Sequence, residues 1–287
     1  MESMAEYLPG RIGYNPKVVE KAKPFVKWVG GKRSIMYELL SRLPKGINNY
    51  YEPFVGGGAL FFEVRKHATK VFLSDTNKDL IITYNVIKNS LDQLLPVLKN
   101  HQKNHSTTYY YDLRSNHSLK HPIEIAARFI YLNKTCFNGL FRVNKRGEFN
   151  VPIGRYKNPN IFDIDNLFAV AKALQGVKIS CMDFTDISPK KGDFVYFDPP
   201  YHPTNAKSFN SYNSVIFSQK DQIRLRDFAI DLSSRGINVM ISNSNVDLIR
   251  SIYGTPPFNI SLVSAPRFVN CKSTKRGAVE ELLITNY

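Results

Sequence analysis

In Asp193-Phe194-Val195-Tyr196-Phe197-Asp198-Pro199-Pro200-Tyr201, an apolar run leads directly into an acid, two prolines and an aromatic residue. Residues 194–197 are apolar at every position, which is typical of a strand buried on both faces of a parallel sheet. The prolines end the strand, because neither can donate a hydrogen bond to a sheet. Asp198 is therefore expected at the carboxyl edge of the sheet, where open α/β proteins bind their ligands. By itself the segment is equally compatible with an alternative to a ligand site, namely a strand followed by a Pro-Pro turn in which Asp198 is an ordinary solvated aspartate.

Length and composition indicate a globular protein. The 287 residues can form one large domain with a smaller companion, and 43% hydrophobic residues are enough for a core. No apolar run approaches the roughly 18 residues of a membrane helix, and no secretion signal is visible at the N-terminus. Cys136, Cys181 and Cys271 are odd in number and far apart, so reduced thiols in a cytoplasmic protein are expected. No cluster has metal-ligand spacing, and no metal is expected.

The balance of charge is strongly basic. Lys and Arg number 39 against 24 Asp and Glu, which gives a formal net charge of +15. A polyanionic partner such as nucleic acid would explain this excess, through phosphate contacts and the release of counterions. A generally basic protein without such a partner is the alternative.

Paired glycines open a helix-like segment near the N-terminus, in Lys27-Trp28-Val29-Gly30-Gly31-Lys32. Glycine permits a tight turn and a close approach of ligand to backbone. A nucleoside-triphosphate P-loop would need glycine at position 26 and Ser or Thr at position 33, but the chain has Val26 and Arg33. The segment is therefore not a P-loop.

A second glycine-rich turn follows the strand-like residues 50–52, in Pro53-Phe54-Val55-Gly56-Gly57-Gly58, and leads into a short helix-like segment. Residues 70–75 form the next predicted strand. It ends in Asp75, 17 residues after Gly58, close to the spacing of about 20 for an acid that binds a ribose. The glycines do not form a full GxGxxG motif, so a nucleoside-like cofactor without phosphates fits better than a dinucleotide.

A basic segment with aromatic residues spans residues 79–160, where Lys and Arg outnumber Asp and Glu by 12 to 5. Its first half is helix-like, as in residues 91–98 and 123–132. Its end contains Asn144-Lys145-Arg146-Gly147, a candidate hairpin turn flanked by short β-type runs. A basic hairpin with aromatics can enter a nucleic-acid groove or stack on a base. A solvated basic loop is the alternative.

The remaining chain alternates predicted helices and strands. These are a helix at 164–174, a strand at 177–182, a helix at 219–232, and strands at 237–242 and 279–285. Residues 202–217 are expected to form a mobile loop, and 272–276 a basic loop. The alternation of β and α on both sides of a basic insertion predicts an α/β fold with a doubly wound sheet.

Asp75, Asp183 and Asp198 are all at the ends of predicted strands, beside the glycine-rich turn. Carboxylates bind a ribose diol in a bidentate manner and accept from an adenine amino group. A cofactor with a ribose, an adenine and a sulfonium would therefore fit. Methyl transfer from a sulfonium requires mainly a nucleophilic nitrogen held in line with the methyl group.

An adenine amino nitrogen is a poor nucleophile, because its lone pair is delocalised into the ring. Asp198 and the carbonyl of Pro199 could accept its two N–H groups and draw the nitrogen toward tetrahedral geometry. Asp198 could also accept a proton as positive charge develops, and Tyr201 would stack on the base. A base paired inside a duplex cannot reach such a pocket, so base flipping is implied.

Three segments resemble a known family. Asp198-Pro199-Pro200-Tyr201 resembles the DPPY motif of amino-group methyltransferases that use S-adenosyl-L-methionine. Residues 27–32 and 52–58 resemble two further motifs of Dam-type DNA adenine methyltransferases, and the order of the motifs around a basic insertion resembles the alpha class. The resemblance runs from about residue 24 to Tyr287, including Lys275-Arg276-Gly277 and the segment 281–287.

This resemblance implies a Rossmann-like doubly wound methyltransferase sheet with an inserted, mostly helical DNA target-recognition domain that carries a β-hairpin. The expected domains are a leader at 1–22, a cofactor-binding catalytic domain at 23–78 and 161–287, and the target-recognition domain at 79–160. A monomer is expected to act on double-stranded DNA, with single-stranded DNA as the alternative substrate. It is expected in the bacterial cytosol or nucleoid, or as a phage-encoded enzyme. A companion restriction endonuclease would fit this family.

The resemblance also implies roles for individual residues. The catalytic motif is Asp198, Pro199, Pro200 and Tyr201. The expected cofactor-binding residues are Trp28, Lys32, Phe54, Gly56, Gly58, Asp75, Asp183 and Asp198. The expected DNA-binding residues are Lys27, Asn138, Leu140, Arg142, Pro152 and Tyr156.

These DNA-binding positions resemble the target-recognition hairpin of GATC-methylating members, with Arg142 reading a guanine. Arginine is the natural bidentate partner of guanine O6 and N7. One departure is the triple glycine at 56–58, where members often have Gly-x-Gly, although the spacing is kept. The leader is another departure.

The expected activity is methylation of adenine N6 in DNA, within GATC. The alternatives are methylation of cytosine N4 or of an RNA adenine, and a non-catalytic DNA-binding module that keeps the fold. Cytosine-N4 enzymes more often have Ser before Pro-Pro, so Asp198 favours adenine. RNA enzymes do not usually carry this insertion. The intact DPPY motif and cofactor residues argue against the non-catalytic module.

Overall fold

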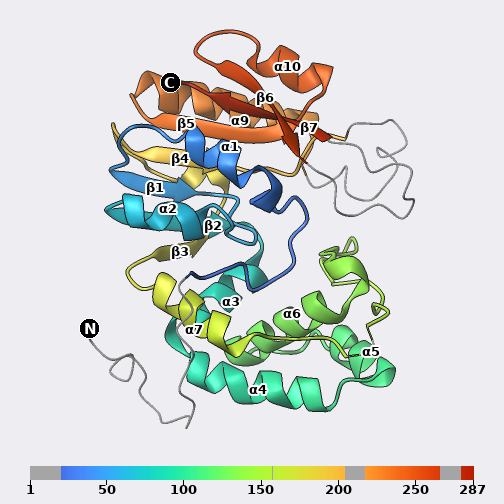
Figure 1. Cartoon of the computed structure of the whole chain (residues 1–287). Coiled ribbons are helices and arrows are strands. Elements are labelled where there is room, and N and C mark those ends of the chain that lie inside the picture. The colour runs from blue at the N-terminus through green and yellow to red at the C-terminus, as the bar shows by residue number, and fades with distance from the viewer. Residues whose placement is uncertain (1–20, 157, 204–216, 266–278) are drawn as a thin grey trace. The chain divides into compact units, whose positions relative to one another are not determined.

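The computed structural model describes residues 21–156, 158–203, 217–265 and 279–287 (Figure 1). The described chain forms two compact units. Unit 1 contains residues 21–31, 56–62 and 77–175, and unit 2 contains residues 32–55, 63–76 and the described part of 176–287. The domain limits expected from sequence stay a prediction. No helix among the described residues is long and apolar enough to cross a membrane.

Unit 2 contains a seven-stranded sheet with the strand order β3-β2-β1-β4-β5-β7-β6. The strands are β1 (Asn49–Glu52), β2 (Lys70–Asp75), β3 (Lys178–Cys181), β4 (Phe194–Phe197), β5 (Asn238–Ser244), β6 (Asn259–Ala265) and β7 (Val279–Thr285). Strands β1 to β5 pair in parallel, and β7 lies antiparallel between β5 and β6. Chain order reverses between β1 and β4, which confirms the predicted doubly wound α/β sheet.

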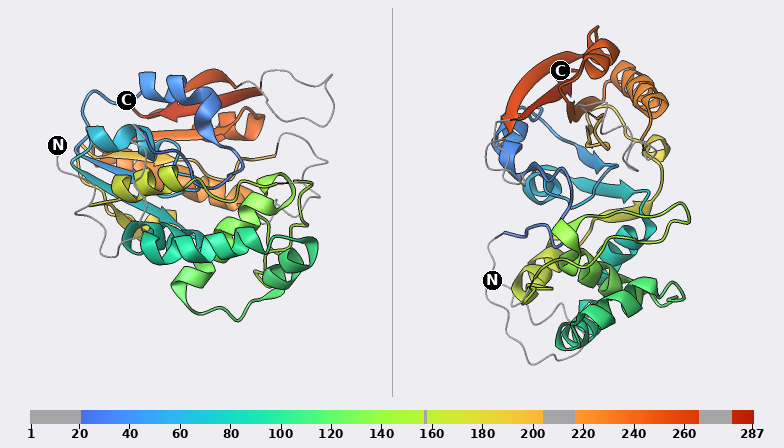
Figure 2. Two further views of the ribbon diagram at one scale, coloured as in Figure 1. Left: turned by 60° about the horizontal axis from the view of Figure 1, so that its bottom comes forward. Right: turned by 90° about the vertical axis from the view of Figure 1, so that its right-hand side faces the viewer.

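Strand β4 is buried on both faces, as its apolar run predicts. Val195 and Phe197 pack in a core with Leu225 and Ala229 of helix α9 (Gln219–Ser234). The right-hand view of Figure 2 shows α9 on one face of the sheet and α1 (Met36–Ser41) on the other. Helices on both faces explain why the central strands carry no polar alternation.

The short helical segments of unit 2 complete the connections between strands. They are the 3₁₀ helices η2 (Lys32–Ile35), η3 (Arg65–His67) and η5 (Phe184–Asp186), and helix α10 (Asp247–Tyr253). The helical turn α2 (Phe61–Val64) follows the glycine-rich turn, as predicted.

Unit 1 is mostly helical, in line with the predicted insertion. Its helices are α3 (Lys78–Asn89), α4 (Leu91–Lys103), α5 (Thr107–Ser115), α6 (Pro122–Thr135) and α7 (Ile164–Ala173), with the 3₁₀ turn η4 (Phe137–Gly139). Helix α6 is the central element, because α3, α4 and α5 all pack against it (Figure 1). Tyr84, Tyr110 and Tyr131 are fully buried there, so some of the aromatic residues of this segment belong to its core.

Residues 136–156 form an irregular segment after α6. The predicted turn is present: the amide of Gly147 donates to the carbonyl of Asn144 at 2.9 Å. The flanking runs are joined only by isolated bridges, Val143 with Phe149 and Cys136 with Ile153. The two runs therefore do not form the continuous strands of the expected hairpin, although the backbone amides of Asn144 and Asn150 donate across the turn to the carbonyls of Glu148 and Arg142, at 2.9 and 3.1 Å.

Two elements of unit 2, β6 and α10, were not predicted from sequence. Residues 1–20, most of the expected mobile loop and the basic loop 272–276 lie outside the described residues.

Candidate active site

Four acidic residues lie at the carboxyl edge of the sheet of unit 2. In strand order, Asp183 follows β3, Asp75 ends β2, Glu52 ends β1 and Asp198 follows β4. The switch in strand order lies between β1 and β4, so Glu52 and Asp198 stand at the position where open α/β sheets bind ligands. Glu52 is buried and accepts a hydrogen bond from the hydroxyl of Tyr50 at 2.7 Å.

Asp198 forms an ion pair with Lys32, whose Nζ lies 2.9 Å from Oδ1. The Lys32 side chain is 4% exposed and that of Asp198 22%. Burial raises the pKa of Asp198 to about 6, while Lys32 opposes the rise and Glu281 adds to it. The ion pair engages one carboxylate oxygen, so Oδ2 can accept from a ligand.

Tyr201 is held at its hydroxyl and over one face of its ring. Its hydroxyl donates to Oε2 of Glu281 on β7 at 2.7 Å, and the ammonium of Lys32 lies 4.7 Å from the ring centre. Burial, together with Asp198 and Glu281, raises the pKa of Tyr201 well above its usual value. Tyr201 is therefore a neutral, oriented aromatic surface next to Asp198.

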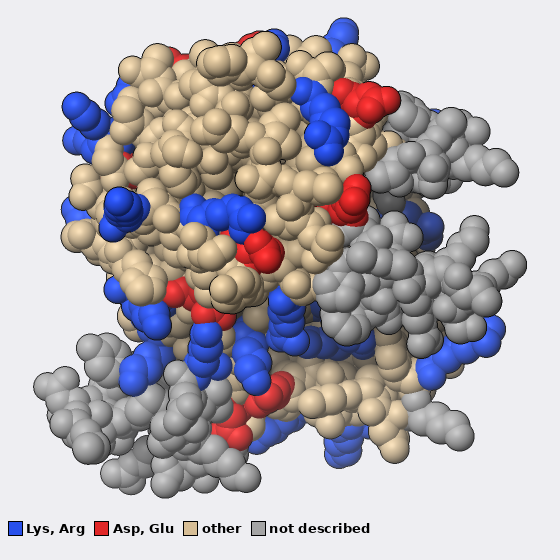
Figure 3. Space-filling model, turned by 45° about the horizontal axis from the view of Figure 1, so that its top comes forward, with Lys and Arg blue, Asp and Glu red and all other residues tan. Residues whose placement is uncertain are grey.

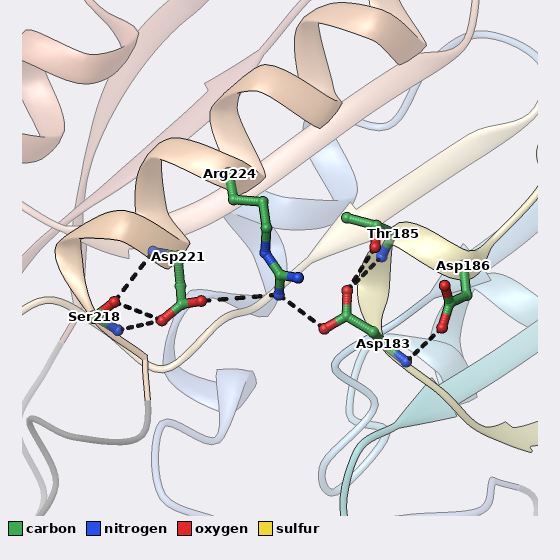
Figure 4. Close-up of polar contacts among 6 residues, drawn as sticks. All are labelled: Asp183, Thr185, Asp186, Ser218, Asp221 and Arg224. Atoms are coloured by element: carbon green, nitrogen blue, oxygen red, sulfur yellow. Dashed lines mark hydrogen bonds and ion pairs between the residues drawn. The ribbon is translucent and has the colours of Figure 1, made fainter.

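Asp183 is engaged by residues on two elements (Figure 4). Its Oδ1 accepts from the amide and hydroxyl of Thr185, at 3.0 and 2.7 Å, and caps η5. Its Oδ2 lies 2.9 Å from Nη2 of Arg224 on α9, which also contacts Asp221 at 3.9 Å. Burial opposes ionisation of Asp183, but the hydrogen bonds from Thr185 and Arg224 lower its pKa overall. Asp183 is thus ionised and shapes the backbone after β3.

Phe54 lies in an aromatic cluster at the same edge. Its ring stacks on Phe184 with a centroid distance of 5.4 Å and meets Phe217 edge-on at 5.6 Å. Asp75 is half-buried at the end of β2, next in the sheet to Cys181. Unit 2 therefore brings Lys32, Phe54, Asp75, Asp183 and Asp198 to one edge of its sheet, together with the DPPY turn.

The other predicted cofactor residues, Trp28, Gly56 and Gly58, belong to unit 1. Gly56 has φ +46°, and a Cβ at this position would lie 2.5 Å from the indole Nε1 of Trp28. Its carbonyl accepts from the buried hydroxyl of Tyr84 at 3.0 Å. Trp28 also stacks on Phe141, with 5.7 Å between centroids. The position therefore requires glycine, and the indole is fixed against the glycine-rich turn.

Lys27 connects the N-terminal segment of unit 1 to residues 136–156. Its amide donates to Oδ1 of Asn133 at 2.8 Å, and its carbonyl accepts from Asn133 Nδ2 at 2.8 Å. Its Nζ lies 3.0 Å from the hydroxyl of Tyr156. A Cβ on Gly139 would clash with the Lys27 side chain at 2.4 Å, and the adjacent Asn138 has φ +55°. Lys27, Gly139 and Tyr156 are thus neighbours, although the first and the last are 129 positions apart in the chain.

Arg142 is folded onto Asn150 across the turn. Its Nε donates to Oδ1 of Asn150 at 2.7 Å and its Nη2 to the carbonyl at 3.2 Å. Pro152 is exposed, and its carbonyl accepts from the amide of Phe137 at 2.9 Å. Leu140 is half-buried at the end of η4. The six predicted DNA-binding residues all belong to unit 1, but Arg142 contacts Asn150 rather than the other five.

Sequence reasoning missed three residues with clear positions in these sites: Glu281, which binds Tyr201; Arg224, which binds Asp183; and Asn133, which binds the Lys27 backbone. Asn133 could have been noticed in the sequence, because it is a polar residue near the end of a largely apolar helix. Glu281 and Arg224 could not, since a charged residue in a strand or an amphipathic helix usually faces solvent.

Comparisons with known proteins identify the family to which the chain is similar. The family model described as "D12 class N6 adenine-specific DNA methyltransferase" matches residues 28–267. The chain is 46% identical over 290 residues to the Type II methyltransferase M.MjaIII of Methanocaldococcus jannaschii, covering 93% of this chain and all of that protein. It is 42% identical over 275 residues to the Type II methyltransferase M1.LlaDCHI of Lactococcus lactis subsp. cremoris, covering 92% and 95%.

A third relative is the DNA adenine methylase of Salmonella typhi, 35% identical over 271 residues and covering 92% of this chain and 95% of that protein. Among solved structures, the N-methyltransferase NodS from Bradyrhizobium japonicum WM9 is similar with a TM-score of 0.40 and 8% identity, covering 90% and 97% of the two chains. A likeness this distant supports no conclusion about function.

Proposed function

The chain belongs to the D12 class N6 adenine-specific DNA methyltransferases, and from this premise we propose that it methylates adenine within GATC in double-stranded DNA. The protein is an adenine-specific DNA methyltransferase, and S-adenosyl-L-methionine is its methyl donor. The observation that supports our residue assignments most directly is the Lys32–Asp198–Tyr201–Glu281 cluster at the switch point of the sheet.

Asp198, Pro199, Pro200 and Tyr201 are the proposed catalytic residues. Oδ2 of Asp198 and the carbonyl of Pro199 accept the two N–H groups of the adenine amine, which increases the lone-pair density on nitrogen. Tyr201 stacks on the flipped base, and Glu281 and Lys32 hold its ring in place. The nucleophile is thus oriented by three groups that follow one rigid strand.

The residues at the sheet edge fit the cofactor. Asp75 is suited to a ribose diol and Phe54 to the flat face of an adenine. Asp183 keeps the backbone after β3 in place beside the adenine, and Asp198 and Lys32 complete the unit 2 contribution. When bound, S-adenosyl-L-methionine supplies an electrophilic methyl group. In unit 1, Trp28, Gly56 and Gly58 are proposed to contact it through a turn in which Gly56 leaves no room for a side chain.

Lys27, Asn138, Leu140, Arg142, Pro152 and Tyr156 are the proposed DNA-binding residues. They lie in the basic segment that resembles the target-recognition hairpin of GATC-methylating enzymes. The excess of 39 Lys and Arg over 24 Asp and Glu supports a phosphate-contacting surface, and Figure 3 shows Lys and Arg side chains spread over one face of the molecule. Arg142 would exchange Asn150 for a guanine edge when DNA binds.

The proposal is tested by transfer of tritium from S-adenosyl-L-methionine to matched oligonucleotides. We expect label in a duplex containing GATC, and none in a duplex with the same bases scrambled or with GATC already methylated at adenine N6. Single-stranded and hemimethylated GATC would then define the preferred substrate. Equal labelling of GATC and scrambled duplexes would refute the target assignment while leaving the activity intact.

The role of Asp198 is tested separately. Asp198→Ala is expected to bind DNA with unchanged affinity and to lose methyl transfer, because the amine loses its carboxylate acceptor. A near wild-type rate in this variant would exclude Asp198 from the reaction.

Three further features belong to the same proposal. The enzyme acts as a monomer on DNA, it functions in the cytoplasm, and a companion restriction endonuclease of the same specificity would fit the family. The domain limits at residues 23, 79 and 161 are part of this proposal as well.

A further inference from the structure

Three polar residues are buried directly behind the DPPY turn. Gln222 lies on α9, and Asn243 and Ser244 end β5; their exposed fractions are 0%, 0% and 5%. Burying an amide without partners is costly, so such groups are normally fully hydrogen-bonded. The hydrogen-bond partners of these three residues therefore show which backbone groups they keep in position.

These contacts form a chain of hydrogen bonds through Asn243 and Gln222 to the backbone of Pro200, which we call the relay. The amides of His202 and Ser244 donate to Oδ1 of Asn243, at 3.3 and 2.9 Å. Asn243 must then present its Nδ2, which donates to Oε1 of Gln222 at 3.0 Å. Gln222 in turn presents Nε2, which donates to the carbonyl of Pro200 at 3.2 Å. Because each amide has one end fixed by a group of known polarity, the orientation of both is determined.

The relay holds the backbone on both sides of Tyr201. Gln222 binds the carbonyl of Pro200 before it, and Asn243 binds the amide of His202 after it. Ser244 Oγ also donates to the carbonyl of His202 at 2.7 Å. The side-chain hydroxyl of Tyr201 is held independently by Glu281. Three elements, α9, β5 and β7, therefore fix the position of one aromatic ring.

We propose that Gln222 and Asn243 are positioning residues for methyl transfer, which keep the Pro199 carbonyl and the Tyr201 ring in the geometry that receives the flipped adenine. This inference rests on the proposed role of Asp198–Tyr201. Neither amide touches substrate; both act through the backbone of residues 200–202. A small displacement of a reacting group slows a reaction more than it weakens binding.

The first test compares Gln222→Met with the wild-type enzyme. Met fills the same space but cannot donate to the Pro200 carbonyl. We expect kcat to fall by about ten- to a hundredfold, with the KM values for cofactor and GATC duplex changed by less than about threefold. Asp193→Asn is the matched control, because Asp193 is equally buried and hydrogen-bonded at the opposite end of β4. It should lower Tm without lowering kcat.

The second test is the pH profile of Gln222→Glu. As a carboxylate, Glu can accept from Asn243 but repels the Pro200 carbonyl. When protonated, it can donate to that carbonyl as Gln does. The kcat ratio of Gln222→Glu to wild type should therefore rise as pH falls from about 8 to 5.5, since burial raises a glutamate pKa above its usual value of about 4.3. The corresponding ratio for Gln222→Met should stay flat.

A folded Gln222→Met enzyme with wild-type kcat, or a flat ratio for Gln222→Glu, would overturn the inference. Asp198→Ala separates this failure from that of the proposed function. If Asp198→Ala is inactive and Gln222→Met is fully active, only the positioning role fails. If Asp198→Ala is active, the proposed role of the DPPY turn fails and the inference falls with it.

Discussion

The carboxyl group of Asp198 is subject to opposing influences on its ionisation. Burial raises its pKa to about 6, and Lys32 limits the rise. The proposed reaction needs the carboxylate, so kcat/KM should fall about tenfold per pH unit below about pH 6. An ordinary aspartate would give this decline near pH 4.

Lys32→Met should move this acidic limb to higher pH, because the cation that favours the carboxylate is removed. Arg235→Met is the control, since Arg235 directly follows α9, forms an exposed ion pair with Asp231 and should leave the limb unchanged. The measurement is the midpoint of the pH profile, which a simple loss of cofactor affinity would not move. An unchanged midpoint in Lys32→Met would show that Asp198 is not the titrating group.

Arg142 is the residue on which discrimination at one guanine is expected to depend. Arg142→Ala should cost about 1–3 kcal/mol of discrimination at a single base pair of the site. The experiment compares kcat/KM on GATC duplexes with single substitutions at each position. Equal weakening on all sequences would instead identify Arg142 as a phosphate contact.

At the scale of elements, the glycine-rich turn makes a sharp prediction. In Gly56→Ala the alanine would have to keep a backbone φ of +46°, and its Cβ would lie 2.5 Å from the Trp28 indole. We expect the free energy of unfolding to fall by about 1–2 kcal/mol from backbone strain alone. We also expect weaker binding of the cofactor. Gly46→Ala is the control, because nothing lies within 4 Å of its Cβ.

Trp28 provides the measurement for this pair of variants. It is the single tryptophan of the chain, so intrinsic fluorescence reports on one indole. The emission should change in Gly56→Ala and remain unchanged in Gly46→Ala. A wild-type spectrum and cofactor affinity in Gly56→Ala would show that the turn tolerates a side chain.

The elements differ in how well sequence predicts them. Strand β4 is bounded by Asp193 and two prolines and is apolar throughout, so its limits were predicted to the residue. Strand β6 was missed: polar and apolar residues alternate in Asn259-Ile260-Ser261-Leu262, but Val263 breaks the alternation. The strand lies at the edge of the described sheet, pairs with β7 and leaves Leu262 46% exposed. A strand of this kind is specified by its partner rather than by its own composition.

In the candidate site, too, local sequence patterns predict some features, and others depend on residues distant in the chain. The acids at strand ends were predictable, because an apolar strand followed by Asp is a local pattern. The contacts that hold them were not. Glu281 reaches Tyr201 over 80 residues, Arg224 reaches Asp183 over 41, and both depend on strand order and helix placement. Motifs therefore predict which residues react, and the fold determines which residues hold them.

At the scale of the molecule, the net charge of +15 predicts a strong dependence of DNA binding on salt. The logarithm of the binding constant should fall linearly with the logarithm of salt concentration. Lys145→Ala and Arg146→Ala, at the exposed turn, should each reduce the slope by about 1 if they contact phosphates. Arg142→Ala should leave the slope nearly unchanged. Equal slopes in all variants would place the phosphate contacts elsewhere.

The route of the chain through its two units limits how specificity can be re-engineered. Unit 1 is assembled from three separate stretches, and the chain passes between the units five times. Grafting residues 79–160 from a relative as one cassette would leave behind Lys27 and Trp28, which Asn133, Tyr156 and Phe141 contact. A chimera with a new recognition sequence should therefore require residues 21–31 to be exchanged together with the graft.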